Sequence, residues 1–181
     1  MIVKPAINPI FYRLRSVEEH DHEWLVELHN DPAVLQNMTH CQPITVAHHH
    51  AWWKKVSHDH RQLRMIFEYA GERAGFTKFY DIDQANRNCI LGGDIHKDFR
   101  GKGLAKKMWT LMLRKCFCDL NLHRVGLTVA EYNSVGHHVY ESLGFKEEGR
   151  LTQSLWRDGR YHDQIVMYLT QQTWNSMPEQ T

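Results

Sequence analysis

The segment IHKDFRGKGLA, residues 95–105, decides the fold of this 181-residue chain. It separates a predicted strand, which ends at its first residue, from a predicted helix over 103–119. The first amide groups of a helix have no partner inside the helix and lie at the positive end of its dipole. A glycine turn at this end can therefore bind an anion through these amides. Lys102, Lys106 and Lys107 crowd this end although the dipole disfavours cations there. The segment predicts an anion site; the alternative is a plain glycine turn before a solvated basic helix face.

Hydrophobic periodicity and turn residues predict the remaining elements. Strands are expected over 11–15, 63–70, 73–81, 86–95, 124–129, 149–156 and 161–169. Helices are expected from the N-cap Ser16, with Glu19 at the capping-box position, to the stop at Asn30-Asp31-Pro32, over 45–57, over 103–119, and after Asn133 to about Leu143. Gly71-Glu72 and Asp158-Gly159 are expected to form hairpin turns. The order predicts a single α/β sheet covered by helices, in one domain over 1–181 with its core at about 11–169.

Charge and hydropathy narrow the functional classes. A net charge of +1 gives no general field for nucleic acid. No run approaches the ~20 apolar residues that span a bilayer, and the N-terminus shows no signal peptide, so we expect a cytoplasmic protein with no membrane partner. The turn lacks the P-loop spacing and the third Rossmann glycine, which disfavours nucleotide hydrolysis and hydride transfer.

Histidine is unusually frequent, with 14 residues. The densest group is His48-His49-His50. Adjacent side chains on a helix diverge by about 100°, so such a run chelates one ion poorly. Neither HExxH nor a Cys/His ligand set is present. We therefore expect solvated surface histidines and no metal site.

Residues 95–105 resemble motif A of the GNAT acetyltransferase superfamily, roughly V-x-P-x-x-[RQ]-G-x-G-[ILV]-[GA]. Asn133, followed seven residues later by Tyr140 and then by Gly144-Phe145, resembles the downstream segment of that family. Lys97 replaces a common proline and Ala105 a frequent glycine, but neither change removes a backbone N–H from the turn. The resemblance implies the GNAT fold, a mixed, mostly antiparallel sheet with helices on both faces.

Two further segments resemble one branch of the superfamily. They are LHNDPAVLQNM at 28–38 and DGRYHDQIVMYL at 158–169. The branch contains ribosomal-protein alanine, spermidine and amino-sugar acetyltransferases. It implies transfer of the acetyl group of acetyl-CoA to a primary amine by direct attack in a ternary complex, and it allows a homodimer.

The resemblance also assigns the donor site. Ile95 and His96 offer backbone groups to the pantetheine arm and the thioester carbonyl, and Asn133 hydrogen-bonds the cofactor where two strands splay. The pyrophosphate cradle is Arg100, Gly101, Lys102, Gly103, Leu104 and Ala105. Tyr140 would protonate the leaving CoA thiolate as general acid. The alternative for Tyr140 is a helix tyrosine packed at the edge of the core.

The proton acceptor stays open. No obvious glutamate lies at the end of the strand 86–95, where some relatives carry their base. Asp94 and His96 at that strand end, Glu68 on a neighbouring strand, or a chain of waters could take the proton of the amine.

The acceptor pocket of this fold is built by the first helices and the last hairpin. Asn30, His50 and Trp53 are therefore expected to contact the acceptor. Residues 43–53 resemble acetyltransferases of nucleotide-linked amino sugars, and aromatic side chains could stack on a base or a sugar. A polyamine would instead need carboxylates such as those of residues 18–23. The acceptor could also be a protein N-terminus, and the chain could instead be a non-catalytic CoA-binding or sensor module.

Overall fold

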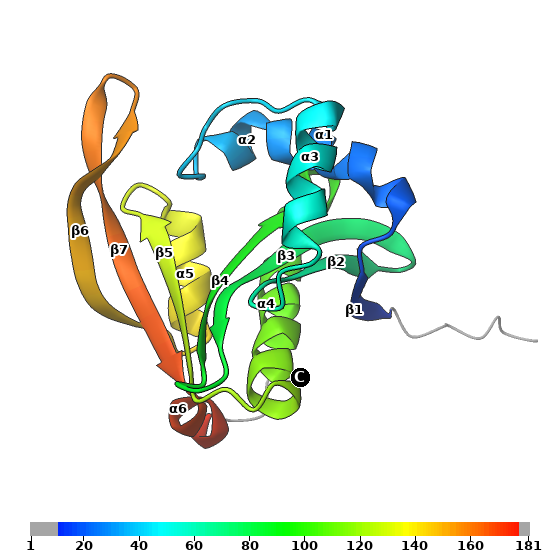
Figure 1. Ribbon diagram of the computed structural model, residues 1–181. Helices are drawn as coiled ribbons and strands as arrows, with labels where there is room; N and C mark the ends of the chain where they lie inside the picture. The colour runs from blue at the N-terminus through cyan, green and yellow to red at the C-terminus, as the bar shows by residue number, and fades with distance from the viewer. Residues whose placement is uncertain (1–10, 178–181) are drawn as a thin grey trace, which may run out of the picture.

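Seven strands form one sheet in the computed structural model, which describes residues 11–177 (Figure 1). The strand order is β1-β2-β3-β4-β5-β7-β6, and only the β4–β5 pair is parallel. The strands are β1 (Tyr12–Ser16), β2 (Leu63–Tyr69), β3 (Glu72–Asp83), β4 (Asn88–Ile95), β5 (Arg124–Ala130), β6 (Lys146–Arg157) and β7 (Arg160–Thr170). The predicted mixed, mostly antiparallel sheet is confirmed. The signal-peptide prediction concerns residues outside the described range.

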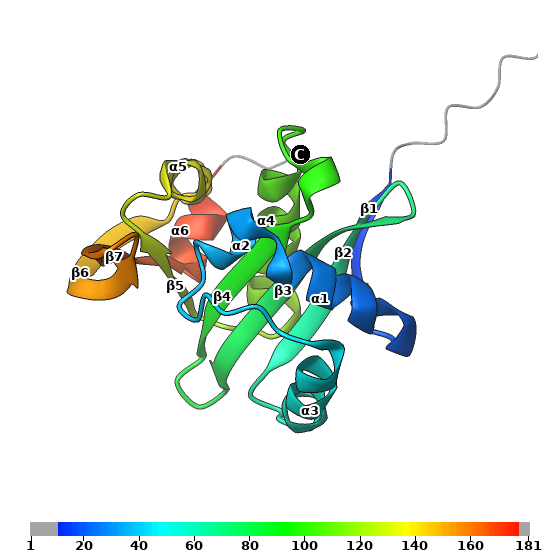
Figure 2. The same cartoon turned by 90° about the horizontal axis from the view of Figure 1, so that it is seen from above.

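Helices cover both faces of the sheet, as predicted. The helical segments are η1 (Glu19–Asp21), α1 (His22–Asn30), α2 (Pro32–Leu35), α3 (Val46–Val56), η2 (Lys97–Phe99), α4 (Leu104–Arg114), η3 (Lys115–Asp119, a π-helix), α5 (Ser134–Ser142) and α6 (Gln171–Ser176). Figure 2 shows α1 and α3 on one side of the sheet and α4 and α5 on the other. Over residues 11–177, no helix is long and apolar enough to cross a bilayer.

The main core lies between the sheet and α4. Leu104, Met108 and Met112 recur at helical spacing and are each at most 2 % exposed. They pack on Phe67 and Phe79 from the sheet. A second, smaller cluster lies under α1 and α2 on the other face, made by Leu25, Leu28, Val34, Ile66 and Phe76. Helices α1 and α2 are therefore attached to the sheet by less apolar contact than α4.

The predicted start of the first helix was wrong. Ser16 ends β1, and Glu18 and Asp21 form the capping box instead, so that α1 begins at His22. Asp21 is fully buried and paired with Arg15 at 2.6 Å, which fixes the chain at this place. The helix start is thus set by a tertiary ion pair.

Asn30-Asp31-Pro32 stops α1 as predicted but also begins α2, which the sequence pattern did not reveal. Asp31 accepts a hydrogen bond from Ala33 N, and Pro32 occupies the first helical position. The first hairpin turns at Ala70-Gly71, one residue earlier than predicted. The second turns at Asp158-Gly159 with φ of 50° and 76°, as predicted.

The β3–β4 pair contains a close backbone approach at Gly75. A Cβ at this position would lie 2.7 Å from the carbonyl oxygen of Asp94 and 3.0 Å from Met108 Sδ. Because the strand backbone cannot yield, we expect Gly75→Ala to lower the free energy of unfolding by about 1–3 kcal/mol, the usual cost of overpacking. Urea denaturation measures this. Gly149→Ala is the control, since a Cβ there meets nothing within 4 Å; equal midpoints for the two variants would contradict the prediction.

Candidate active site

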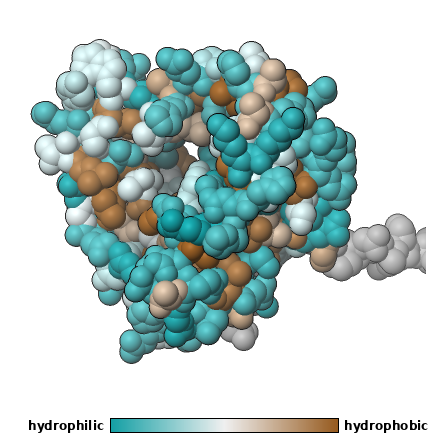
Figure 3. Space-filling view, in the orientation of Figure 1, coloured by the Kyte–Doolittle hydropathy of each residue, from teal (hydrophilic) through white to brown (hydrophobic). Residues whose placement is uncertain are grey.

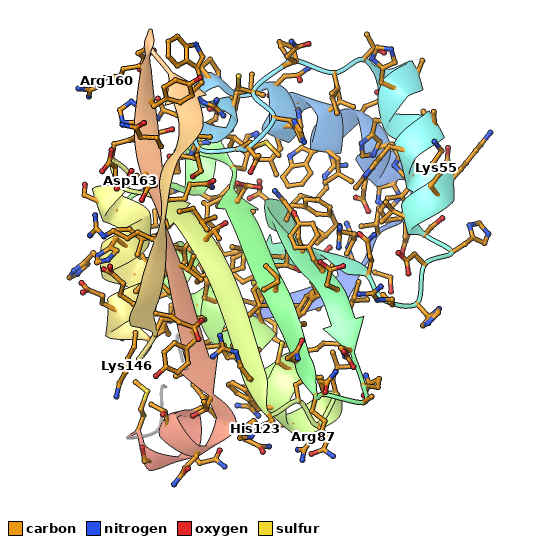
Figure 4. The ribbon with its side chains drawn as sticks, turned by 60° about the vertical axis from the view of Figure 1, so that its left-hand side comes forward. Lys55, Arg87, His123, Lys146, Arg160 and Asp163 are labelled. Carbon is orange, nitrogen blue, oxygen red and sulfur yellow. The ribbon has the colours of Figure 1, made fainter. Side chains whose placement is uncertain are left out.

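The two parallel strands β4 and β5 pair only at their first residues and then separate. The paired positions are Asn88 to Ile90 on β4 and Arg124 to Gly126 on β5. Figure 4 shows the paired end near the labelled Arg87 and His123, which are joined by a hydrogen bond of 2.7 Å between His123 N and Arg87 O. Beyond Ile90 the edge of β4 that faces β5 has no ladder partner. The sheet therefore contains an internal opening.

Backbone amides of β4 point into this opening. His96 N donates to Ala74 O on β3 at 2.9 Å, and amides alternate in direction along a strand. The N–H groups of Gly93 and Ile95 consequently face the β5 side. Of the predicted pair, Ile95 keeps its amide available, whereas the amide of His96 is already used within the sheet.

A cleft of about 910 Å³ extends from the opening across the sheet face beneath α1 and α3. Gly92, Gly93 and Asp94 of β4 line it, together with Asn133 and Tyr140. The space-filling surface in Figure 3 is hollowed in the upper middle of the view, below the position of α2 in Figure 1. Asn133 and Tyr140, which the sequence pattern predicts to act together, are thus brought to the same cleft.

Tyr140 lies on α5 with its ring against Trp109 at a centroid distance of 4.6 Å. Its hydroxyl makes no hydrogen bond with any described residue. Burial raises the pKa of Tyr140 well above the ordinary value, and the negative charge of Asp94 adds to the effect. The phenol is therefore protonated at neutral pH and free to donate.

Asn133 is the N-cap of α5. Its Oδ1 accepts from Gly136 N at 3.0 Å, which satisfies one of the free amides at the helix start. The Nδ2 group has no partner among the described residues and can serve a ligand in the cleft. The side chain therefore combines a structural and a potential binding role.

The predicted phosphate turn joins η2 to α4. Gly101 and Gly103 have φ of 74° and 71°, a left-handed conformation that glycine adopts without strain. Gly103 is the N-cap of α4 and no side chain caps this end. Leu104 is buried in the core, so only the backbone of that residue can face a ligand. The turn offers free amides at a positive helix end, which fits an anion such as a pyrophosphate.

The cations of the turn differ in their availability. Arg100 donates to Ile95 O at 3.0 Å and pairs with Asp31 at 3.2 Å, so its side chain braces the turn against α2. Lys102 and Lys106 are exposed, with Lys102 Nζ 5.1 Å from the Phe99 ring centre. Of these three side chains, the two lysines are those that can reach a phosphate.

The predicted acceptor residues do not line the cleft. Asn30 holds the backbone of Ile44 with two hydrogen bonds of 2.8 Å, and His50 and Trp53 pack on His22. The neighbours His29, His49 and Trp52 line the cleft instead. The correction is one residue in every case, because a shift of one position turns a helical side chain by about 100°.

A bridge of contacts crosses the far end of the opening. The Tyr132 hydroxyl donates to Gln36 O at 2.5 Å, and the Arg157 guanidinium donates to Met38 O. These bonds connect the segment after α2 to the β5–α5 loop and to the last hairpin. The opening is consequently bounded at both ends.

Comparison with known proteins agrees with this geometry: residues 12–146 match the family described as the acetyltransferase (GNAT) domain. The chain belongs to the GNAT family. It is 28 % identical to the spermidine N(1)-acetyltransferase of Escherichia coli, over 88 % of this chain and 86 % of that protein. It is 33 % identical to the Vibrio cholerae spermidine N(1)-acetyltransferase, over 66 % and 69 % of the two chains.

The solved structures include a Vibrio cholerae spermidine N-acetyltransferase in complex with CoA and spermine. It superposes on this GNAT protein with a TM-score of 0.87 at 28 % identity, covering 91 % of this chain and 98 % of the other. The protein is therefore an acetyl-CoA-dependent N-acetyltransferase, as its sequence motifs predict.

Of the three proposed proton acceptors of this acetyltransferase, Asp94 lies in the cleft, and Glu68 and His96 line a second pocket. Asp94 lines the cleft and is paired with Lys78 at 2.5 Å. Glu68 is paired with Arg13 and Arg15 outside the cleft. His96 stacks on Trp24 in a separate pocket. Asp94 is the one of the three that lines the cleft.

The histidines are less exposed than predicted. His22 and His49 are buried and their rings meet through a 2.9 Å contact between His22 Nδ1 and His49 Nε2. Glu19, His22 and His50 each offer a ligand atom within 4.8 Å of the others, so this group could hold a metal ion. Sequence spacing could not reveal it, because residues 19 and 22 meet residue 50 only through the packing of α1 on α3.

His49 makes the stability of the acetyltransferase sensitive to acid. Burial lowers its pKa from 6.5 to about 4, and the neighbouring His22 adds to the effect. The unfolded chain therefore binds a proton between these values that the folded chain does not. We expect the free energy of unfolding to fall by up to about 3 kcal/mol as the pH drops from about 6.5 to 4.

Urea denaturation across this pH range tests the effect of His49. His49→Gln should flatten the dependence, and His48→Gln, at the exposed neighbouring position, should leave it unchanged. The pKa of His22 is also lowered, by burial, so part of the slope should remain in His49→Gln. A slope equal to that of the wild type in His49→Gln would refute the assignment.

Proposed function

We propose that this acetyltransferase moves the acetyl group from acetyl-CoA to the primary amine of a small molecule by direct attack in a ternary complex, with Tyr140 as the general acid. The observation that carries the proposal is the position of Tyr140. Its side chain lines the cleft where β4 and β5 separate, and its protonated hydroxyl has no hydrogen bond with a residue of the described range 11–177.

The residues around the opening support each part of the reaction. The neutral amine attacks the thioester carbon, forming the C–N bond while the amine gives up one proton. The amides of Gly93 and Ile95 point where an oxyanion could be stabilised. As the C–S bond breaks, Tyr140 protonates the thiolate, and Asp94 is the nearest of the named groups for the amine proton.

The same residues also suggest where the donor, acetyl-CoA, would bind. The pyrophosphate would lie on the amides of residues 101–105, with Lys102 and Lys106 as countercharges and Arg100 holding the turn in shape. Asn133 Nδ2 would bind the pantetheine arm, which reaches the opening along β4, and the amide of Ile95 would serve the thioester carbonyl of the cofactor. His96 would make no hydrogen bond to the cofactor through its amide, which is used within the sheet, and would only help to hold the end of β4 in place.

For the acceptor we propose a nucleotide-linked amino sugar, with a polyamine as the alternative. The relatives named above act on spermidine, which favours the polyamine, and they offer no support for the amino sugar. The aromatic and histidine side chains of the cleft wall support the amino sugar through stacking and hydrogen bonding. A protein N-terminus as acceptor would need an entrance to the cleft that is wide enough for a peptide.

A thiol-release assay with acetyl-CoA tests the proposed function. The panel contains amino-sugar nucleotides, polyamines, aminoglycosides and peptides. We expect release of CoA with at least one amine and mass addition of one acetyl group to it. Tight binding of CoA without turnover on any amine would favour the non-catalytic sensor module. Light scattering of the same sample tests the homodimer that the family resemblance allows.

Substitutions of Asn133 separate its two roles. Asn133→Ala removes both the cap and Nδ2, and we expect a loss of about 1 kcal/mol in stability together with a raised KM for acetyl-CoA. Asn133→Asp keeps an acceptor for the cap but has no donor, so its stability should stay close to that of the wild type while the KM still rises. An unchanged KM in both variants would remove Asn133 from the donor site.

A further inference from the structure

Arg64 is a buried cation without an anionic partner. It lies on β2, lines the cleft and is 6 % exposed. Its described hydrogen bonds go to uncharged groups, the carbonyl oxygens of Leu63 and Phe79 and the side-chain oxygen of Gln62. Burying a charge without a countercharge is costly, so natural proteins rarely keep one without a use.

One edge of this guanidinium has donors that no described residue uses. Nε is buried and has no hydrogen-bond partner. Nη2 has one bond, to the side chain of Gln62, out of the two that it can donate. Nε and Nη2 form one side of the planar group, which matches two oxygens of a carboxylate or phosphate. The rings of Tyr80 and Trp52, at 4.3 and 5.9 Å, hold the plane in place.

The cleft lining offers Arg64 no free carboxylate; Asp59, outside the lining, acts on its charge from a distance and holds Gln62. Asp94 is the one carboxylate among the lining residues, and it is paired with Lys78 at 2.5 Å. The remaining ionisable lining groups include His29, His48 and His49. A polycation such as a polyamine would meet an excess positive charge here and no free carboxylate.

The sheet register fixes how far Arg64 lies from the reaction. Arg64 is the cross-strand partner of Lys78, and Lys78 is the partner of Gly92. The three residues form one row across neighbouring strands, with their side-chain positions on the same face. Since strands lie about 4.8 Å apart, the backbone of Arg64 is roughly 10 Å from that of Gly92, on the same face of the sheet.

We infer that the acceptor is an amine that carries an anionic group, a phosphate or a carboxylate, and that Arg64 binds this group while the nucleophilic nitrogen lies at the opening. The inference rests on the proposed function, because it places the nitrogen at the opening beside Tyr140. It makes Arg64 the residue that selects acceptors by charge.

The first test compares four acceptors of matched chain length: an ω-aminoalkyl phosphate, an ω-amino carboxylate, an ω-amino alcohol and a diamine. We expect the two anions to have a kcat/KM at least about 10-fold above that of the alcohol, with the diamine last. The phosphate and carboxylate arms identify which anion the site prefers. A diamine that reacts as well as the anions would overturn the inference.

The second test replaces the side chain. Arg64→Gln should raise the KM for the anionic acceptor about 10- to 100-fold, while the KM for acetyl-CoA stays unchanged and the kcat/KM on the amino alcohol falls far less. Arg64→Lys should recover part of the loss. Arg61→Gln is the matched control, since Arg61 is exposed and pairs only with exposed Asp81. Equal losses on all acceptors would show a structural role and refute the inference.

A binding measurement keeps the two proposals separable. Trp52 lies next to Arg64, so its fluorescence should report occupancy of the anion site without turnover. Quenching by the aminoalkyl phosphate that is lost in Arg64→Gln, with no CoA release from any amine, would support the anion site and reject the acetyl transfer. Release of CoA from amines without any quenching by the aminoalkyl phosphate would support the acetyl transfer and reject the anion site.

Discussion

Tyr140→Phe is expected to lower kcat about 100-fold or more and to leave the KM for acetyl-CoA nearly unchanged, since general acid catalysis typically contributes 10²- to 10⁴-fold. The substitution removes one oxygen that has no hydrogen bond with a described residue, so the fold should tolerate it. The ring still packs on Trp109 and Phe145. Steady-state thiol release with a saturating acceptor measures the effect.

The control for Tyr140 is Tyr168→Phe. Tyr168 lies on β7 beneath the Arg124 guanidinium and outside the cleft. Because burial raises the pKa of Tyr140, the wild-type rate should not fall on the alkaline side below about pH 10, the ordinary tyrosine value. If Tyr140→Phe turns over at the wild-type rate, Tyr140 is not the general acid and is only a tyrosine packed at the edge of the core.

Gly103→Val is expected to raise the KM for acetyl-CoA about 10- to 100-fold. Gly103 has φ of 71°, where a β-branched residue is strongly strained, and it caps the helix whose amides are proposed to hold the pyrophosphate. Relief of that strain would rotate the first amides of α4 away from their present direction. Calorimetry with CoA measures the same loss without turnover.

A matched control separates strain from binding. Gly71→Val introduces the same residue at φ of 84° in the β2–β3 turn, where a Cβ also meets nothing within 4 Å. It should cost a similar amount of stability and leave CoA affinity unchanged. Equal CoA affinities for Gly103→Val and the wild type would contradict the phosphate-turn assignment.

Much of the fold follows from local sequence. The apolar spacing of α4, the Asp158-Gly159 turn and the alternation of β5 each depend on near neighbours in the chain. The start of α1 does not, because Asp21 is fixed by Arg15 from β1. The assignment of the entire chain to one domain stays a prediction.

The site was predictable in part. Asn133 and Tyr140 follow from a spacing that resembles the family, and the structure brings them to one cleft. At the acceptor wall, Asn30, His50 and Trp53 each lie next to a residue that lines the cleft, since periodicity finds a helix more easily than it fixes which face turns inward. Arg64 was overlooked, although it stands two residues before the buried Ile66 on the same face of β2.

The opening between β4 and β5 has one more consequence. Two adjacent strands with unpaired edges would gain hydrogen bonds by pairing along their whole length. Here three residue pairs join the strands at one end, and at the other end Tyr132 and Arg157 bond the segment after α2 and not β4. The opening therefore persists in the folded protein. The unpaired amides of β4 inside it stay free, so a bound molecule can complete the hydrogen bonding of the sheet.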